Sequence, residues 1–377
     1  MHNSTNDEIL VEVRNHVAHL TLNRPQALNA LSLDMLKRLR ELFDGWAHDP
    51  NVYAVVARGS GPKAFCAGGD VRGLYNSITG LGPRLHEEFF ITEYTLNYQM
   101  HRFLKSTGKP YIALMDGIVM GGGMGISQGA TFRIVGDRTK MAMPETKIGL
   151  FPDVAGTYFL SRATGAMGLY LGLTSNMING ADAIAARLAD TYMTVDAQHL
   201  FFQQLDAVNW SNTPLNDVVR LITSNATTAP ASMLSSSLAS LRDVIEKHFA
   251  GKKNVQDIIA SLEAETEPSA IKWAHKTVED LQKRSPTLMT VTKQQIENGH
   301  KLSVAECLRL ELGMMYRAFE HSDVVEGIRA LAIDKDNQPR WSPPTLAGVD
   351  TEVVASFFAP RWTAAEHPLA KLEEQFG

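Results

Sequence analysis

Residues 115–161 read MDGIVMGGGMGISQGATFRIVGDRTKMAMPETKIGLFPDVAGTYFLS, and this stretch holds the features on which fold and site depend. Three consecutive glycines, 121–123, follow an apolar run and precede a segment that is typical of a helix. Backbone N–H groups at such a position have no partner within the helix and can meet an anion. Glu145 and Asp153 each follow a proline directly, which favours an extended or turned backbone and keeps both acids off a regular helix face.

The composition is that of an ordinary globular protein. The 377 residues are 44% apolar and 20% charged, with a formal net charge of -5. This length allows two or three domains, or one large domain with an appendage. The charge gives no signature of polyanion binding, so we expect no nucleic-acid partner.

The context of the cysteines and the lack of long apolar runs indicate in which cellular compartment the protein is expected. Cys66 and Cys307 lie far apart in apolar contexts, so we expect buried free thiols in a reducing compartment and neither a disulfide framework nor a CxxC metal site. No run approaches eighteen apolar residues, and the first residues form no basic or apolar leader. We therefore expect a cytoplasmic protein without a membrane partner.

The first half of the chain alternates β-rich runs with amphipathic helices, which predicts an α/β fold. The runs 9–13 and 17–22 indicate a hairpin, and Ser32 can cap the helix that follows. The apolar run 52–57 predicts a strand buried on both faces. Residues 85–104 predict a helix with buried aromatic side chains, to which we assign no chemistry. These aromatic residues are Phe89, Phe90, Tyr94, Tyr98 and Phe103.

The second half is predicted to be mostly helical. Residues 165–207 are rich in Ala and Leu, with a break near Gly180, and residues 210–240 are rich in Ser, Thr, Asn and Pro, as a linker would be. Further helical periodicity is found at 255–262, 270–283 and 304–319. The predicted organisation is a core (1–210), a helical C-terminal region that packs on it (211–345) and a tail (346–377).

Two glycine-rich loops are the first candidate for chemistry. AFCAGGDV (64–71) and GIVMGGGMG (117–125) each follow a strand-like apolar run. Two backbone N–H groups that converge from such loops would make an oxyanion hole for a thioester or a similar carbonyl. The alternative is that the glycines only allow tight turns or close packing. Neither loop matches a nucleotide-binding fingerprint, which disfavours NAD and ATP.

Residues 125–129 match the G-x-S-x-G pattern of a nucleophile elbow. An elbow needs its serine at the sharp turn, whereas here the triple glycine already makes the turn and Ser127 falls about one turn into the helix behind it. A triad also needs a downstream histidine, and the later histidines have no distinguishing context. We therefore do not expect a serine nucleophile.

Glu145 and Asp153 are the third candidate. Surface carboxylates are usually just solvated, and that alternative stays open for this pair. Their position between prolines and apolar residues favours partial burial, which would raise a carboxylate pKa and suit it for general-base work. No HExxH motif and no cluster at metal-ligand spacing is found, so no metal is expected.

Five segments, taken in order, resemble the crotonase (enoyl-CoA hydratase/isomerase) superfamily. They are LNRPQALNALS (22–32), FCAGGDVRGLY (65–75), the triple glycine, MPETKIGLFPDVAGTYFL (143–160) and VVEGIRALAIDKDNQPRW (324–341). The resemblance covers about residues 9 to 345 and is weakest between about 190 and 285. It implies a crotonase-like spiral of ββα turns with an α-helical C-terminal part, and an acyl-CoA substrate.

The same resemblance implies roles for individual residues. The backbone N–H groups of Gly69 and Gly122 would form the oxyanion hole. The loop from Ala67 to Val71 would hold the adenine end of CoA together with Ala27. Lys335 aligns with a lysine that approaches CoA phosphates, although an exposed lysine without a role is an equal alternative. The residues of the loop from Ala67 to Val71 that would hold CoA are Ala67, Gly68, Asp70 and Val71. CoA would be part of the substrate, so no separate cofactor is implied.

Two positions separate two branches of this superfamily. Hydratases carry a glutamate where this chain has Gly125, and usually a glycine where it has Asp153. The pair Glu145 and Asp153 resembles the hydrolase branch, which implies hydrolysis of an acyl-CoA thioester, with 3-hydroxyisobutyryl-CoA of valine catabolism as the leading substrate. Ala155 and Thr157 depart from that branch, which more often has glycines there.

The resemblance leaves the mechanism open in two respects. Glu145 would either attack the thioester carbonyl or act as a base toward water. Asp153 would orient either the 3-hydroxyl of the acyl group or the water. Alternative functions are hydration or isomerisation of an enoyl-CoA, and a non-catalytic binding protein of the same fold. A homo-oligomer is possible, because many members assemble through C-terminal helices, but the C-terminal part could instead fold over its own site.

Overall fold

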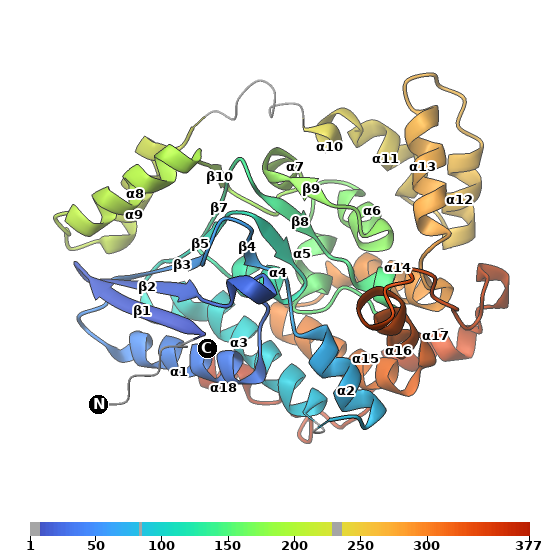
Figure 1. Ribbon diagram of the computed structural model, residues 1–377, viewed down its shortest axis with the longest axis horizontal. Helices are drawn as coiled ribbons and strands as arrows, with labels where there is room; N and C mark the ends of the chain where they lie inside the picture. Colours follow the sequence, from blue (N-terminus) through green and yellow to red (C-terminus); the bar gives the residue numbers. More distant parts are fainter. Residues whose placement is uncertain (1–7, 83–84, 228–235) are drawn as a thin grey trace.

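The structure is a computed structural model that describes residues 8–82, 85–227 and 236–377, and two β-sheets form its centre (Figure 1). The strands of the first sheet, in spatial order, are β1 (Ile9–Arg14), β2 (Val17–Leu22), β3 (Ala54–Gly59), β5 (Tyr111–Met115), β7 (Phe132–Val135) and β10 (Thr191–Tyr192). Those of the second sheet are β4 (Ala64–Cys66), β6 (Ile118–Met120), β8 (Lys140–Ala142) and β9 (Ile178–Asn179).

The chain passes from the first sheet to the second in each turn of a spiral. β3 leads to β4, β5 to β6 and β7 to β8, and a helical segment follows each pair. The helices of these turns are α2 (Val71–Thr79), α3 (His86–Thr107), α4 (Gly122–Gln128), α5 (Gly156–Ser161) and α6 (Met167–Thr174). The pairs β2–β3, β3–β5 and β5–β7 are parallel, as are β4–β6 and β6–β8. This is the predicted spiral of ββα turns.

The N-terminal predictions are confirmed. β1 and β2 form an antiparallel hairpin with Ile9 opposite Leu22. The Ser32 hydroxyl accepts a hydrogen bond from the Met35 amide at 3.2 Å and caps α1 (Leu33–His48), as its position before an apolar stripe predicts. Cys66 and Cys307 are both free and buried, as expected.

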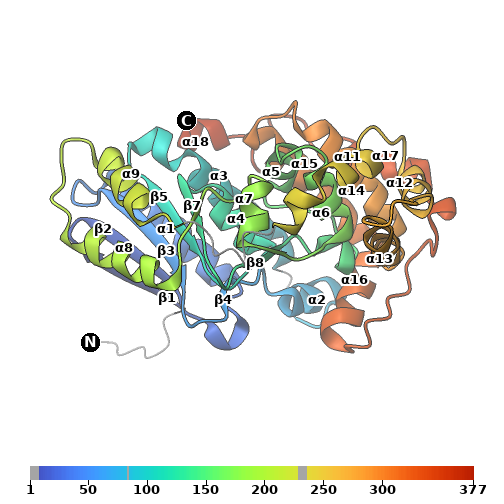
Figure 2. The same cartoon turned by 90° about the horizontal axis from the view of Figure 1, so that it is seen from above.

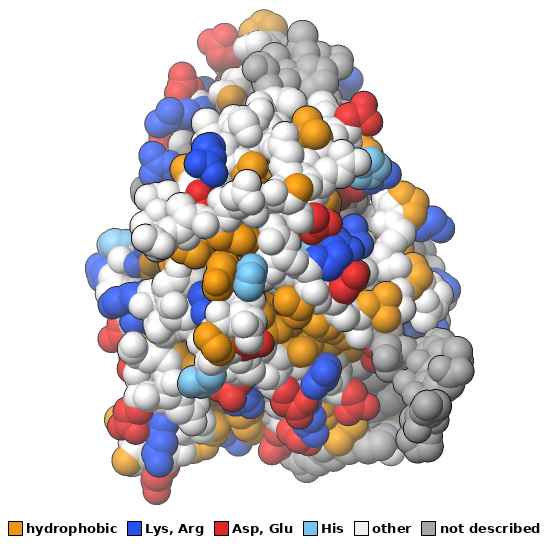
Figure 3. All heavy atoms as spheres, turned by 90° about the vertical axis from the view of Figure 1, so that its left-hand side faces the viewer, with side chains coloured by type: hydrophobic (Ala, Val, Ile, Leu, Met, Phe, Trp, Pro, Cys, Tyr) orange, Lys and Arg blue, Asp and Glu red, His pale blue; other side chains and the backbone are white. Residues whose placement is uncertain are grey.

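The central strands of the first sheet are buried on both faces, and their side chains alternate between two cores. In β3, Val55 belongs to the main core and Val56 to a smaller cluster on the opposite face, as the period of two for a strand requires. α8 (Val195–Ala207) and α9 (Pro214–Asn225) cover that opposite face (Figure 2). Figure 3 shows the face of the molecule at the left-hand side of Figure 1, where hydrophobic side chains lie among charged ones.

The middle of the chain differs from the sequence prediction. Residues 165–207 are not one broken helix, because β9, α7 (Gly180–Ala185) and β10 intervene. Gly180 begins α7, and Asn179 and Asp182 form a capping box there. The linker predicted at 210–240 contains α9 and α10 (Ser237–Ser240), and its residues 228–235 lie outside the described ranges. The polar composition of 210–240 hid α9, whose Val218 and Ile222 are four residues apart and both buried.

The C-terminal part is helical, as predicted, and its elements return to the spiral. They are α11 (Arg242–Phe249), α12 (Val255–Glu263), α13 (Ile271–Leu281), α14 (Pro286–Gly299), α15 (Val304–Glu320), α16 (Ser322–Ile328), the π-helical turn η3 (Arg329–Ile333), α17 (Thr351–Phe358) and α18 (Leu372–Phe376). α14 and α15 pack against α5, α16 packs against α2, and α18 packs against α3. The predicted domain boundaries themselves stay a prediction.

Close backbone contacts join α16 to the segment that carries Glu145. A Cβ atom on Gly327 would lie 2.3 Å from the carbonyl carbon of Ile148, and one on Gly149 would lie 2.2 Å from the carbonyl oxygen of Asp323. Only glycine permits backbones to approach this closely. The C-terminal part of the chain therefore packs directly against the segment that carries Glu145.

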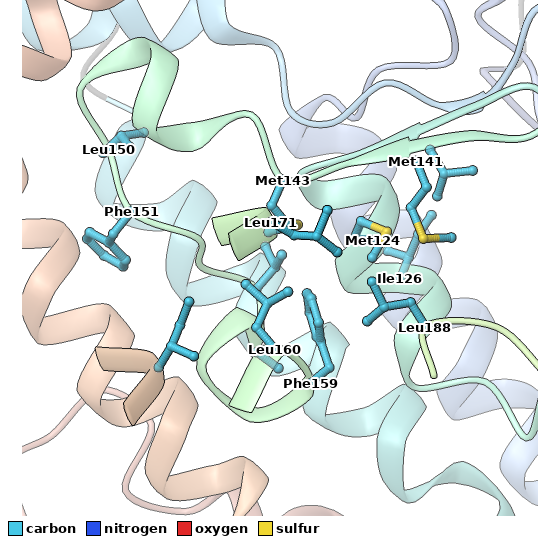
Figure 4. Packing of buried hydrophobic residues seen from close by; sticks show 14 of the residues in the cluster. Met124, Ile126, Met141, Met143, Leu150, Phe151, Phe159, Leu160, Leu171 and Leu188 are labelled. Atoms are coloured by element: carbon cyan, nitrogen blue, oxygen red, sulfur yellow. The ribbon is translucent and has the colours of Figure 1, made fainter. Parts of the chain in front are cut away.

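The main core surrounds the stretch 115–161. Met124 and Ile126 of α4 point toward Met143, Phe159 and Leu160 of the carboxylate segment and α5 (Figure 4). These side chains are all less than one tenth exposed. No helix within the described ranges is long and apolar enough to cross a membrane.

Candidate active site

Three loops meet because they leave three neighbouring strands at the same edge. β4, β6 and β8 are adjacent and parallel in the second sheet. The glycine loop 67–70 follows β4, the triple glycine follows β6, and the turn with Glu145 follows β8. Parallel strands that lie side by side bring their carboxyl ends to one edge of the sheet. These strands are only three residues long, which is why the sequence pattern did not reveal them.

The Gly69 and Gly122 amides lie next to each other. The Leu31 amide donates to Gly68 and the Asp70 amide donates to Leu31, at 2.8 and 3.1 Å, so the Gly69 N–H points away from this pairing. Gly122 is the first residue of α4, where an amide has no acceptor within the helix. A Cβ atom on Gly122 would lie 3.4 Å from the Gly69 nitrogen. The two loops are therefore placed as an oxyanion hole requires.

One pocket of about 330 Å³ brings together most of the predicted site residues. Those that line it are Ala67, Gly68, Gly69, Asp70, Val71, Gly122, Glu145 and Asp153. Asp70 also caps α2, because its Oδ1 accepts from the Gly73 amide at 3.0 Å. Much of the remaining wall is apolar, with Leu74, Phe89 and Ile148 among its residues. A small polar centre in an apolar pocket is typical of a site for a small molecule.

Ala27 and Lys335 do not line this pocket. Ala27 ends the short helix η1 (Pro25–Ala27), in a loop that contacts the pocket wall through the Ala67 amide and the Leu28 carbonyl at 3.0 Å. Lys335 is exposed and follows η3, which packs on α2. Their contact with CoA stays a prediction.

Glu145 is buried at the base of the pocket, on the one-turn helix η2 (Glu145–Ile148). Only 5% of its surface is exposed, so the solvated alternative does not hold. Its Oε2 has no hydrogen-bond partner within the described part of the chain, and a Cβ on Gly121 would lie 3.0 Å from its Oε1. Burial, and next the charge of Asp153, raise the pKa of Glu145 well above its ordinary value of 4.5.

Asp153 is also buried, and Tyr94 holds its carboxylate. The Tyr94 hydroxyl donates to Asp153 Oδ2 at 2.7 Å, and burial raises the pKa of Asp153 to about 6. Tyr94 comes from α3, so the expectation that the aromatic residues of this helix carry no chemistry is wrong for Tyr94. Phe89 and Phe90 of the same helix line the pocket.

Glu93 is a pocket residue that the sequence analysis missed. It is 2% exposed, and its Oε1 has no hydrogen-bond partner among the described residues. A Cβ on Gly122 would lie 2.5 Å from that oxygen, so Glu93 lies against the predicted oxyanion hole. Burial, and next the charge of Asp153, raise the pKa of Glu93 well above its usual range. Glu93 and Asn97 are four residues apart on the buried side of an aromatic helix, which is the signal that could have identified them.

Ser127 is not placed as a nucleophile, in agreement with the sequence analysis. Its hydroxyl donates to the Gly123 and Met124 carbonyls of the same helix at 2.8 and 3.1 Å, and it is fully buried. It does not line the pocket. In the ranges that the structure describes, no group of three His, Cys, Asp or Glu side chains could hold a metal ion.

Gly125 has no space for a side chain. A Cβ there would lie 2.6 Å from the Val154 Cβ and 2.9 Å from the Asn97 Nδ2. A glutamate at this position, as in hydratases, would displace the loop that carries Asp153. The absence of a second glutamate is therefore built into the packing between α4, α3 and the Asp153 loop.

Gly125→Ala is accordingly expected to destabilise the protein by about 1–3 kcal/mol, because overpacking outweighs the helix propensity of alanine. Gly45→Ala is the matched control, since Gly45 lies in α1 with nothing within 4 Å of its Cβ position. That variant should gain about 0.5–1 kcal/mol. Urea unfolding measures the free energy of unfolding of both variants. A stabilised Gly125→Ala variant would show that this packing is not tight.

Comparisons with known proteins show the family of the chain. The model of the family described as enoyl-CoA hydratase/isomerase matches residues 17–358. The "Probable 3-hydroxyisobutyryl-CoA hydrolase 3" of Arabidopsis thaliana is 37% identical, over 94% of this chain and 92% of that protein. The "3-hydroxyisobutyryl-CoA hydrolase, mitochondrial" of Xenopus laevis is 37% identical, over 90% of this chain and 85% of that protein.

Two solved structures match along almost the whole chain. A carnitinyl-CoA dehydratase from Mycobacterium thermoresistibile is 38% identical with a TM-score of 0.84, covering 94% of this chain and 97% of that one. An enoyl-CoA hydratase from Rhodobacter sphaeroides is 34% identical with a TM-score of 0.82, covering 94% and 98%. These matches confirm the predicted fold class.

Proposed function

Because the chain belongs to the enoyl-CoA hydratase/isomerase family, we propose its reaction from the chemistry that its pocket allows within that family. The protein is an acyl-CoA thioester hydrolase that converts 3-hydroxyisobutyryl-CoA and water to 3-hydroxyisobutyrate and CoA, a step of valine catabolism. The relatives named above carry the name of this activity. The observation that supports it most directly is the pair of buried carboxylates, Glu145 and Asp153, in one pocket with Gly69 and Gly122.

The amides of Gly69 and Gly122 bind the thioester oxygen. Negative charge develops on this oxygen when the carbonyl carbon is attacked, and fixed N–H donors stabilise that charge without reorganising. The loss of one such donor costs about 3 kcal/mol of transition-state stabilisation. Phe89 lies 3.1 Å from the Cβ position of Gly69, so apolar side chains shield this site from water.

Glu145 supplies the attack. As a nucleophile, its carboxylate forms a C–O bond to the acyl carbon, the C–S bond breaks, and CoA leaves as a thiolate; water then hydrolyses the anhydride and restores Glu145. As a base, it removes a proton from a water that attacks the same carbon. Both routes need the ionised carboxylate. The 3.0 Å between its Oε1 and the Cβ position of Gly121, the residue before Gly122, supports this proposal.

Asp153 orients the group next to the reacting carbonyl. The hydrogen bond from Tyr94 occupies Oδ2, which leaves Oδ1 to accept from the 3-hydroxyl of the acyl group or from the water. Glu93 lies beside the proposed oxyanion hole, because its Oε1 is 2.5 Å from the Cβ position of Gly122. Gly125 argues against hydration of an enoyl-CoA, because the second glutamate of that mechanism has no space here.

An acyl-CoA panel tests this function. Purified protein is mixed with 3-hydroxyisobutyryl-CoA, other 3-hydroxyacyl-CoA thioesters and enoyl-CoA thioesters, and free thiol is followed with a thiol reagent. We expect thiol release, fastest with 3-hydroxyisobutyryl-CoA. Loss of enoyl absorbance without free thiol would favour the hydratase alternative, and no turnover with any thioester would favour a non-catalytic binding protein.

The same assay after dialysis against a chelator tests whether a metal or another cofactor is needed.

The pH dependence follows from the raised pKa values. The ionised form of Glu145 is the active one, and its pKa is raised, so kcat/KM should fall as the pH is lowered through that raised pKa. Asp153, with a pKa of about 6, should make the loss steeper below pH 6. A pH–rate profile with 3-hydroxyisobutyryl-CoA checks this. A flat profile down to pH 5 would contradict an essential buried carboxylate.

Location and assembly are further proposals. We propose a cytoplasmic protein, which cell fractionation tests; the X. laevis relative carries the word mitochondrial in its name. We propose an acyl-CoA as its only small-molecule partner, with no nucleic-acid or membrane partner. A homo-oligomer is possible even though the C-terminal helices pack on their own chain, and light scattering of the purified protein measures its mass.

A further inference from the structure

Two side chains from the C-terminal helices hold the loop that carries Asp153. Gln295 of α14 donates through Nε2 to the Pro152 carbonyl at 2.6 Å and to the Thr157 hydroxyl at 2.7 Å. Glu311 of α15 accepts from the Ala155 amide and from the Thr157 amide, both at 2.8 Å. Gln295 and Glu311 are fully buried. The loop is therefore tethered on both sides of Asp153.

This loop has a backbone that needs support. Val154 and Ala155 have φ values of 52° and 69°, in the left-handed region that glycine adopts easily and branched residues rarely do. Ala155 and Thr157 stand where the hydrolase branch more often has glycines. Two consecutive left-handed residues without a glycine persist only where the surrounding structure holds them. The amides that Glu311 binds are those of Ala155 and Thr157.

Glu311 is an unusual residue for a helix core. It forms no ion pair with a lysine or arginine in the ranges that the structure describes. Burial raises its pKa to about 8, whereas the hydrogen bonds from Thr157 and Ala155 act in the opposite direction and favour the charged form. A carboxylate is the side chain whose two oxygens can both accept from backbone amides, whereas a glutamine would direct its NH₂ group at one of them. The side chain is thus matched to this loop.

We propose that Glu311 and Gln295 are positioning residues for Asp153. This inference rests on the proposed function, in which the Asp153 carboxylate orients the acyl hydroxyl or the water. Neither Glu311 nor Gln295 lines the pocket, so both act through the loop and not by contact with substrate. The helices α14 and α15 lie outside the predicted core 1–210, and they set the direction of a carboxylate within it.

A double-mutant cycle tests the proposal. Glu311→Gln should lower kcat about 100-fold, with KM within about 3-fold, because a small displacement of a catalytic group has an effect of this size. In an Asp153→Asn background the same substitution should change kcat by less than about 3-fold, because the group it positions is already lost. Glu297→Gln is the matched control: Glu297 lies on α14, is exposed, and its carboxylate pairs with Lys293, so the substitution should leave kcat unchanged.

The outcomes separate the proposal from the function on which it rests. Equal losses from Glu311→Gln in both backgrounds would overturn the positioning role, as would a KM that rises as much as kcat falls. If Glu311→Gln does not fold, Gln295→Met removes both Gln295 hydrogen bonds and enters the same cycle with the same expected coupling. A wild-type protein that releases no thiol from the panel would overturn the proposed function instead.

Discussion

Glu145→Gln is expected to lower kcat for thioester hydrolysis by about 1,000-fold or more, the upper range for the loss of a general base or nucleophile. Glutamine keeps the shape of the side chain but has no charge to attack a carbonyl or to accept a proton. Thiol release from 3-hydroxyisobutyryl-CoA measures the effect. Glu88→Gln, which makes the same change at an exposed position of α3, is the matched control and should keep full activity.

The binding of substrate should survive this substitution, because Glu145 contributes one group to a pocket of many contacts. Isothermal titration with CoA can check it. Full hydrolytic activity in Glu145→Gln would contradict the assigned role. A single turnover of the wild type in ¹⁸O-labelled water can then detect the anhydride, because label in the Glu145 carboxylate indicates it. Label in the acid product alone fits both a base and water attack on the acyl carbon of an anhydride.

Asp153→Asn is expected to lower kcat about 100-fold, because the oriented group loses its charged acceptor. The substitution should also lower the pKa of Glu145. The charge of Asp153 raises the pKa of Glu145, so its removal should lower that pKa and move the acidic limb of the pH–rate profile to lower pH. Kinetics from pH 5 to 9 measure both changes in one series of assays.

Tyr94→Phe is the control for the Asp153 substitution. It removes the 2.7 Å hydrogen bond to Asp153 but keeps the negative charge beside Glu145. We expect a smaller loss, about 10-fold, without the shift of the acidic limb to lower pH. An acidic limb that stays in place in Asp153→Asn would contradict the electrostatic contact between Glu145 and Asp153.

Local patterns in the sequence predicted the parts of the fold that local forces determine. The hairpin, the Ser32 cap and the burial of the strand at Val55 and Val56 follow from periodicity and capping, and the structure has all three. The strands β4, β6 and β8 were missed because three residues are too short to show a period. Their adjacency explains why the glycine loops and Glu145 meet, and only tertiary structure shows it.

Sequence motifs predicted the central residues of the candidate site but not the residues that surround them. Gly69, Gly122, Glu145 and Asp153 came from motifs and line one pocket, although their roles stay predictions. The residues that surround them were missed because they come from helices whose aromatic or aliphatic pattern indicates only a core. These residues are Glu93, Tyr94, Gln295 and Glu311. A buried polar residue on the apolar side of a helix was the available signal.

Gly125 shows how structure adds a reason to a sequence difference. In the sequence it is an absent glutamate, whereas in the structure its Cβ position is blocked by Val154 and Asn97. The left-handed backbone at Val154 and Ala155 brings the Val154 side chain against the Cβ position of Gly125. Glu311 holds this backbone by accepting a hydrogen bond from the Ala155 amide. The same loop therefore carries Asp153 and fills the space that the hydratase glutamate would need.

The most direct test of this account follows two products in one reaction. The protein is incubated with 3-hydroxyisobutyryl-CoA, and free CoA thiol and the corresponding unsaturated acyl-CoA are both measured as the substrate disappears. Hydrolysis predicts one thiol for each substrate consumed and no unsaturated thioester. Formation of the unsaturated acyl-CoA without free thiol would contradict hydrolysis, because it would show a dehydratase that works without a glutamate at position 125, where a side chain has no space.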